Sequence, residues 1–408
     1  MYKLVKIPTS LDPYLNRFAD IFTKPGHGSF CHLMATLAVC SKSKTIANLH
    51  DTMANDCSYK KSRSTYNWFI TKGKWDEDEV AQRKADQFFE ALQLKSGDRV
   101  LLIIDDTYAE KKGNHTDGVG KFFDHGKGYI HGNSFVTSVL QSKGLFIPHK
   151  AKMYLKKEDD GVDFKTKIQI ALKDIIKPLK VPETIKLMIV FDSWWFSADL
   201  IHSCLKMGYH VTCQIKSDKK VVLNDGISLN VDTFAEKLVD SSYRKIKVNA
   251  RSKRKSYFIA ERIVELDRIG KVKLVLSKEK RNGNPKYYIS TNSELSAEEI
   301  LSIYEDRWNI ETSHREANQK LGFKDYQLRS KRSIERFIQL VFAIWTGILL
   351  LELEDLEPRK RPKTIGEMVD RIRSECIFDL VRDVMEFFNL PVPEEGLLFR
   401  MRTLGMKT

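Results

Sequence analysis

Two short apolar runs that end in carboxylates constrain the fold of this chain more than any other feature. The run DRVLLIIDD ends at Asp105 and Asp106, and the run TIKLMIVFD ends at Asp192. Short apolar runs between polar flanks predict buried strands, and side chains at the ends of such strands can meet at one site. A carboxylate there is costly to desolvate unless it is solvated, paired or bound to metal. For either aspartate alone, a turn or cap role is the alternative.

The segments around these runs predict a mixed sheet with helices on its faces. Residues 133–155 read as two strands joined by a turn at 142–144. An amphipathic helix over 162–179 precedes the second run, and a helix over 197–208 and a strand over 209–216 follow it. This order, β-β-β-α-β-α-β, predicts an α/β (α+β) fold built on a mixed five-stranded sheet flanked by helices.

A basic, β-rich segment over 218–295 interrupts this pattern. Residues 241–290 hold 15 Lys and Arg against 4 Asp and Glu, a net charge of +11, with aromatic residues interleaved. We predict an all-β insertion that contacts a nucleic-acid backbone, and a solvated charged face is the alternative. The candidate contacts are Arg251, Lys253 and Arg254.

Composition supports a polyanionic partner. The 408 residues carry a formal net charge of +14, which favours nucleic acid. None of the six cysteines forms a Cys-x-x-Cys pair, which argues against a zinc ribbon. The apolar stretch over 337–351 is short for a membrane span and is expected to be a buried helix. The glycine-rich stretch over 118–133 lacks the order of a phosphate-binding P-loop and is expected to be a flexible loop beside the site.

One helical face near residue 311 combines an acid with phosphate-binding side chains. Ser296 and Glu299 form a capping box that begins a helix. At about 100° per residue, five residues of that helix fall on one face: Tyr304, Arg307, Glu311, Arg315 and Asn318. Arginine binds phosphate through two parallel hydrogen bonds, so this face suits phosphate and metal. A solvated face with ion pairs within the helix is the alternative.

These features together resemble the RNase H-like core of DDE (Asp-Asp-Glu) transposases from prokaryotic insertion sequences, in the branch with a β-rich insertion. The resemblance rests on LLIIDDTYAEKKG, MIVFDSWWFSADLI and IYEDRWNIETSHREANQKLGF, and it covers roughly residues 98–350. The last stretch matches the branch's tyrosine-arginine-glutamate-lysine signature at Tyr304, Arg307 and Glu311. The signature's lysine falls at Asn318, where Arg315 or Lys320 is the candidate substitute.

The resemblance implies a catalytic triad of Asp106, Asp192 and Glu311. The family's Asp-Thr pairing favours Asp106, which precedes Thr107, over the adjacent Asp105. Carboxylate oxygens prefer Mg²⁺ or Mn²⁺, and two ions about 4 Å apart would promote cleavage at transposon ends and strand transfer into target DNA.

The resemblance also implies an organisation and partners. The expected parts are a helical DNA-end-binding domain (1–96), a catalytic core in two parts (97–217 and 296–354) separated by the insertion (218–295), and a helical C-terminal region for dimerisation (355–408). The expected partners are double-stranded DNA, as inverted-repeat ends and target, and a second copy of the chain in a synaptic complex. We expect a cytoplasmic, nucleoid-associated protein without a membrane partner.

Two alternatives to a transposase stay open. One is a domesticated or inactive DNA-binding protein of the same fold, which Asn318 favours and the retained carboxylates argue against. The other is a nuclease of this fold that cleaves DNA without joining it.

Overall fold

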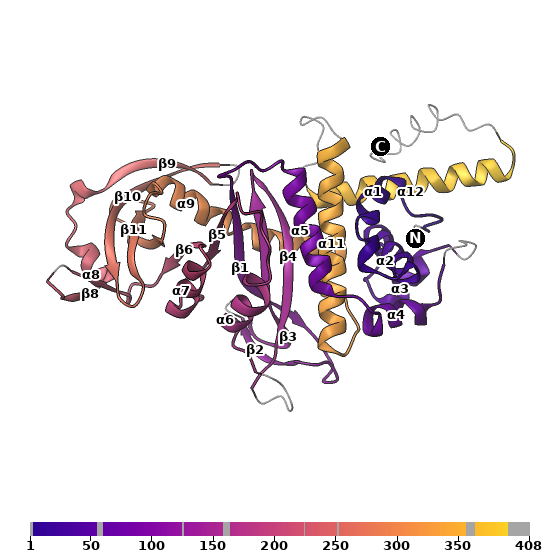
Figure 1. Cartoon of the computed structure of the whole chain (residues 1–408), viewed down its shortest axis with the longest axis horizontal. Helices are drawn as coiled ribbons and strands as arrows, with labels where there is room; N and C mark the ends of the chain where they lie inside the picture. The colour runs from indigo at the N-terminus through magenta and orange to yellow at the C-terminus, as the bar shows by residue number, and fades with distance from the viewer. Residues whose placement is uncertain are drawn as a thin grey trace.

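The computed structural model describes residues 3–54, 60–124, 126–157, 164–223, 225–250, 253–355 and 364–390. In this part of the chain one continuous sheet runs through the molecule, and a group of helices packs at one end of it (Figure 1).

The centre of the sheet is the predicted five-stranded core. Its neighbouring strands lie in the order β4, β3, β1, β5, β6. The first strand, β1, is antiparallel to β3 and parallel to β5, which is itself parallel to β6. The bounds are β1 (Arg99–Glu110), β3 (Gly128–Ser142), β4 (Leu145–Tyr154), β5 (Lys186–Phe191) and β6 (His210–Ile215). This mixed sheet confirms the predicted RNase H-like fold class.

The glycine-rich stretch is a β-hairpin, so the prediction of a flexible loop was wrong. Strand β2 (Gly120–Asp124) pairs antiparallel with the start of β3, with Phe122 opposite Ile130. Both side chains are largely buried. Glycines interrupt the apolar residues of this stretch, so the sequence showed no strand pattern from which the pairing could be predicted.

The basic insertion extends the same sheet. Strand β12 pairs antiparallel with β6, and the order continues through β11, β10, β7 and β8, while β9 pairs with β10. A short helix, α8 (Val231–Glu236), interrupts the predicted run of strands. The strands are β7 (Lys220–Val222), β8 (Ser228–Asn230), β9 (Arg244–Ala250), β10 (Lys253–Leu266), β11 (Gly270–Lys278) and β12 (Lys286–Ser290).

A long apolar helix joins the sheet to the N-terminal helices. Helix α11 contacts β4, α5 and α2, and Figure 1 shows α5 and α11 between the sheet and α1–α4. Residues 337–351 of this helix are buried, as predicted. The apolar segment Lys331–Leu351 is longer than the predicted stretch and reaches the length of a membrane span, but the 18-residue apolar stretch within it is wholly inside the protein. The helices here are α1 (Asp12–Asn16), α2 (Lys24–Val39), α3 (Ile46–Thr52), α4 (Arg63–Lys72), α5 (Glu77–Ala91), α11 (Lys331–Asp355) and α12 (Ile365–Phe387).

The two faces of β1 bury different cores, and this division positions the site. Leu102 and Ile104 belong to the larger core, whereas Leu101 and Ile103 belong to a smaller one that includes side chains of α9 and α10. The remaining helices are α6 (Lys167–Ile170), which continues as a π-helical turn (Ala171–Ile176), α7 (Ala198–Lys206), α9 (Ala297–Asp306) and α10 (Asn309–Leu321).

Candidate active site

Asp105, in the middle of β1, and Asp192, directly after β5, lie on the same face of the sheet. Strand β1 continues to Glu110, so the prediction that a strand ends at Asp105 and Asp106 was wrong. Ile103 lies beside Val190 in the parallel pair, and both belong to the smaller core. Alternate residues of a strand point to the same face, so Asp105 and Asp192, each two positions further along, point toward α9 and α10. The backbone N–H of Trp194 donates to Asp192 Oδ1 at 2.9 Å and orients that carboxylate.

Glu311 reaches this face from α10 and is joined to Asp105 through an arginine. Arg307 Nη1 donates to Asp105 Oδ2 at 3.1 Å, and Nη2 donates to Glu311 Oε1 at 3.0 Å. The side chain of Arg307 is 14% exposed, that of Asp105 is 19% exposed and that of Glu311 is 34% exposed. The arginine therefore lies between two of the acids.

The predicted single helix through this region is two helices. The capping box of Ser296 and Glu299 begins α9 as predicted, but α9 ends at Asp306 and α10 begins at Asn309. Arg307 keeps right-handed helical dihedral angles across the break, so its four-residue spacing to Glu311 still gives an ion pair.

Asp106 lies on the opposite face of β1. It forms an ion pair with Lys167, and the Tyr108 hydroxyl donates to its Oδ2 at 3.2 Å. The Lys167 ammonium also lies over the rings of Tyr108 and Trp194, 5.0 and 5.4 Å from their centroids. The structure thus brings Asp105, rather than the predicted Asp106, together with Arg307 and Glu311.

The carboxylate pair on the shared face is electrostatically unfavourable. The pKa of Asp105 is raised to about 7: burial raises it most, Arg307 opposes the shift, and the negative charges of Asp192 and Asp106 add to it. Among the described residues, no group of three or more His, Cys, Asp or Glu side chains lies close enough together to hold a metal ion, and Arg307 separates Asp105 from Glu311. The candidate donors are nonetheless all carboxylate oxygens, the ligand type that a hard divalent cation prefers.

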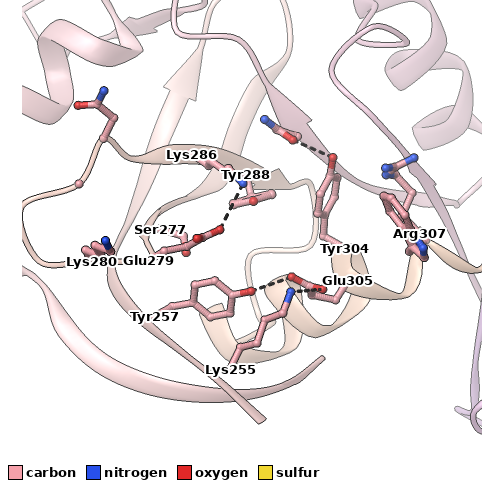
Figure 2. A pocket seen from close by; sticks show the side chains of 14 residues that line it. Lys255, Tyr257, Ser277, Glu279, Lys280, Lys286, Tyr288, Tyr304, Glu305 and Arg307 are labelled. Atoms are coloured by element: carbon pink, nitrogen blue, oxygen red, sulfur yellow. Dashed lines mark hydrogen bonds and ion pairs between the residues drawn. The ribbon is translucent and has the colours of Figure 1, made fainter. Parts of the chain in front are cut away.

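A basic and aromatic hollow of about 560 Å³ adjoins this face. Tyr304 and Arg307 line one end of it, and Figure 2 shows Lys255, Lys280 and Lys286 around the remainder. The residues that line it are Gln214, Lys255, Tyr257, Ser277, Glu279, Lys280, Gly283, Asn284, Lys286, Tyr288, Tyr304, Glu305, Arg307 and Trp308. Lysine with aromatic rings is the combination that binds a nucleic-acid strand.

Several contacts fix the wall of the hollow. The Tyr304 hydroxyl donates to Gln214 Oε1 at 2.8 Å, and its ring lies 4.7 Å from that of Tyr288. The Tyr257 hydroxyl donates to Glu305 Oε1 at 2.8 Å. These contacts connect α9 to strands β6, β12 and β10. Helix α9 therefore packs against both the insertion and the side of the core sheet that carries the carboxylates.

Comparison with protein families gives the same assignment as this geometry. The model of the archaeal ISC1217 transposase family matches residues 127–349, and that of the DDE superfamily endonucleases matches residues 18–226. Each match spans more than half of the chain. The chain belongs to the DDE transposase family. A comparison with curated proteins finds no match.

The other DNA-contact residues predicted for this DDE transposase lie in two places. Arg315 and Asn318 are exposed on α10, whereas Lys320 is half-buried near Gly366 of α12. Lys253 and Arg254 begin β10, where the structure describes only their backbone, and Arg251 lies outside the described residues.

Sequence reasoning missed a contact that holds α10 against β1. His314 Nε2 lies 2.8 Å from Thr137 Oγ1, and Thr137 Oγ1 donates to the Asp105 carbonyl at 3.1 Å. The histidine is also stacked on Phe323. No local pattern marks this contact, because its partners lie on three separate elements.

Proposed function

We propose that this protein is a DNA transposase that cleaves DNA at the ends of its element and joins those ends to target DNA. The observation that carries the proposal is the pair of Arg307 ion pairs that join Asp105 to Glu311, with Asp192 near enough to raise the pKa of Asp105, beside a hollow lined by lysine and aromatic side chains. Family membership supports an endonuclease that acts on DNA.

In this proposal Asp105 takes the role that the family resemblance implies for Asp106. Asp105, Asp192 and Glu311 would hold Mg²⁺ or Mn²⁺. When bound, such ions make water or a DNA 3′-hydroxyl a stronger nucleophile and stabilise the leaving oxygen of an in-line displacement at phosphorus.

The protein's own groups position the DNA. The Trp194 N–H orients Asp192, and the Thr137–His314 contact holds α10, with Glu311, against β1. The lysines of the hollow attract the backbone of a DNA end. Arg315, with Asn318 beside it, extends the contact along α10.

The decisive experiment uses a supercoiled plasmid that carries the DNA flanking the coding region on both sides, incubated with the protein and Mg²⁺. Joined products support a transposase, nicking without joining indicates a nuclease, and a gel shift without cleavage indicates a DNA-binding protein. Asp192→Asn is expected to abolish cleavage and to leave DNA binding intact. Cleavage that survives in Asp192→Asn would contradict the assignment of the site.

A further inference from the structure

Arg307 occupies the space between two proposed metal ligands. Its guanidinium donates to Asp105 and to Glu311 at the same time, through different nitrogens. The other Asp105 oxygen, Oδ1, accepts from the Asp106 N–H at 2.9 Å. Both oxygens of this carboxylate are therefore engaged.

A divalent cation and the guanidinium would compete for the same oxygens. Each can neutralise the buried carboxylate, and leaving that carboxylate without either partner is costly. Because Arg307 is tethered one helical turn from Glu311, it competes at high effective concentration.

The guanidinium also borders the hollow. Arg307 and Tyr304 line both the carboxylate face and the hollow, and the Arg307 guanidinium carbon lies 5.7 Å from the Tyr304 ring centroid. Figure 2 shows Arg307 at the Tyr304 end of the hollow, across from the lysines. A DNA phosphate held there would accept two parallel hydrogen bonds from the planar guanidinium, as a carboxylate does.

We propose that Arg307 is a latch, which pairs with Asp105 and Glu311 in the DNA-free protein and transfers to a DNA phosphate when DNA enters the hollow, thereby opening the metal site. The inference rests on the proposed function and adds regulation to the same site. Bound DNA then raises the affinity of the protein for a divalent cation, and a bound cation raises its affinity for DNA by the same factor.

The test measures Mn²⁺ affinity from the electron paramagnetic resonance signal of free Mn²⁺. In DNA-free protein, Arg307→Gln is expected to bind Mn²⁺ about tenfold more tightly than the wild type, within the usual range of such couplings. Added duplex DNA, corrected for the Mn²⁺ that it binds alone, raises the affinity of the wild type by a similar factor and leaves Arg307→Gln nearly unchanged.

Arg329→Gln is the control, because it removes the same charge from an exposed position outside α10 and the hollow. It is expected to leave the Mn²⁺ affinity of the DNA-free protein unchanged. If Arg307→Gln does not fold, Arg307→Lys replaces it: lysine keeps the charge but lacks the planar fork, and we expect an intermediate affinity.

The latch and the proposed function fail in different ways. Equal Mn²⁺ affinity in the wild type and Arg307→Gln, or an equal effect of DNA on both, overturns the latch alone. Absence of Mn²⁺ binding in every variant, or binding that is unaffected by Asp192→Asn and Glu311→Gln, overturns the proposed metal site and the latch with it.

Discussion

Asp105 and Arg307 lie 202 positions apart in the sequence, yet Arg307 Nη1 donates to Asp105 Oδ2 at 3.1 Å. This ion pair joins the middle of β1 to the break between α9 and α10, and it is made by the aspartate of the Asp105–Asp106 pair that faces the third acid. The neighbouring Asp106 instead pairs with Lys167 on the opposite face.

The two adjacent aspartates provide a matched pair of variants. Asp105→Asn is expected to lower DNA cleavage by about a thousandfold, because metal-assisted stabilisation of a phosphoryl transition state is worth several kcal/mol. Asp106→Asn is expected to keep cleavage and to lower stability by about 1–3 kcal/mol, since Lys167 loses its charged partner. Plasmid cleavage and urea denaturation measure the two effects. A cleavage defect confined to Asp106→Asn would reverse the assignment.

The basic start of β10 is expected to set the salt dependence of DNA binding. Changing Arg251, Lys253 and Arg254 together to Gln should reduce the slope of log affinity against log salt by about 2–3, because each phosphate contact contributes roughly 0.9 to that slope. Fluorescence anisotropy with duplex DNA over a range of salt concentrations measures it. The control changes three exposed lysines outside the insertion, Lys173, Lys177 and Lys180. An equal loss of slope in both triple variants would remove the special role of β10.

Asn318 offers a gain-of-function test. The position is exposed on α10, and the family's signature places a phosphate-binding lysine there. Asn318→Lys is expected to raise affinity for duplex DNA about tenfold, the value of one charge-assisted hydrogen bond. Gln319→Lys adds the same charge at the adjacent exposed position, which points in another direction on the helix. If both variants bind DNA equally well, the added net charge explains the gain, and the prediction that residue 318 contacts a DNA phosphate is wrong.

His314 is expected to make the protein sensitive to acid. Burial, with a smaller contribution from the positive charge of Lys324, lowers the pKa of His314 from 6.5 to about 3. The unfolded chain therefore takes up a proton below pH 6.5 that the folded chain refuses until about pH 3, so stability falls as the pH drops through this window.

The variant His314→Gln tests this linkage, because glutamine can still donate to Thr137 but does not titrate. The urea concentration at the midpoint of unfolding is measured at neutral pH and at about pH 4. The difference between the two values should be smaller in His314→Gln than in the wild type. His131→Gln, at an exposed position on β3, is the control. A pH dependence in His314→Gln as steep as that of the wild type would contradict the prediction.

The end of α12 is expected to contribute to self-association. Phe387 and Phe388 are 81% and 64% exposed there, and Val384 is also exposed. Exposed apolar side chains that cluster mark interaction surfaces. Changing both phenylalanines to Ser should shift the sedimentation coefficient from dimer to monomer, while Phe123→Ser, at an exposed site on β2, should not. Unchanged sedimentation in the double variant would place any dimer contact elsewhere.

Local patterns in the sequence determined the strands of the five-stranded core, the carboxylate that follows β5 and the helix start at Ser296, but they ended the first strand too early, because β1 continues past Asp105 and Asp106 to Glu110. They also placed Arg307 and Glu311 one turn apart, because helical spacing depends only on neighbouring residues. The apolar strand of β2 and the break between α9 and α10 carried no such local signal.

Only the tertiary structure decided which aspartate faces the site. Adjacent residues of a strand point to opposite faces, so the sequence placed one of Asp105 and Asp106 on each side of the sheet. The packing of α9 and α10 against Leu101, Ile103 and Val190 selected the face of Asp105. That selection depends on contacts between segments some 200 positions apart, and local periodicity contains no information about them.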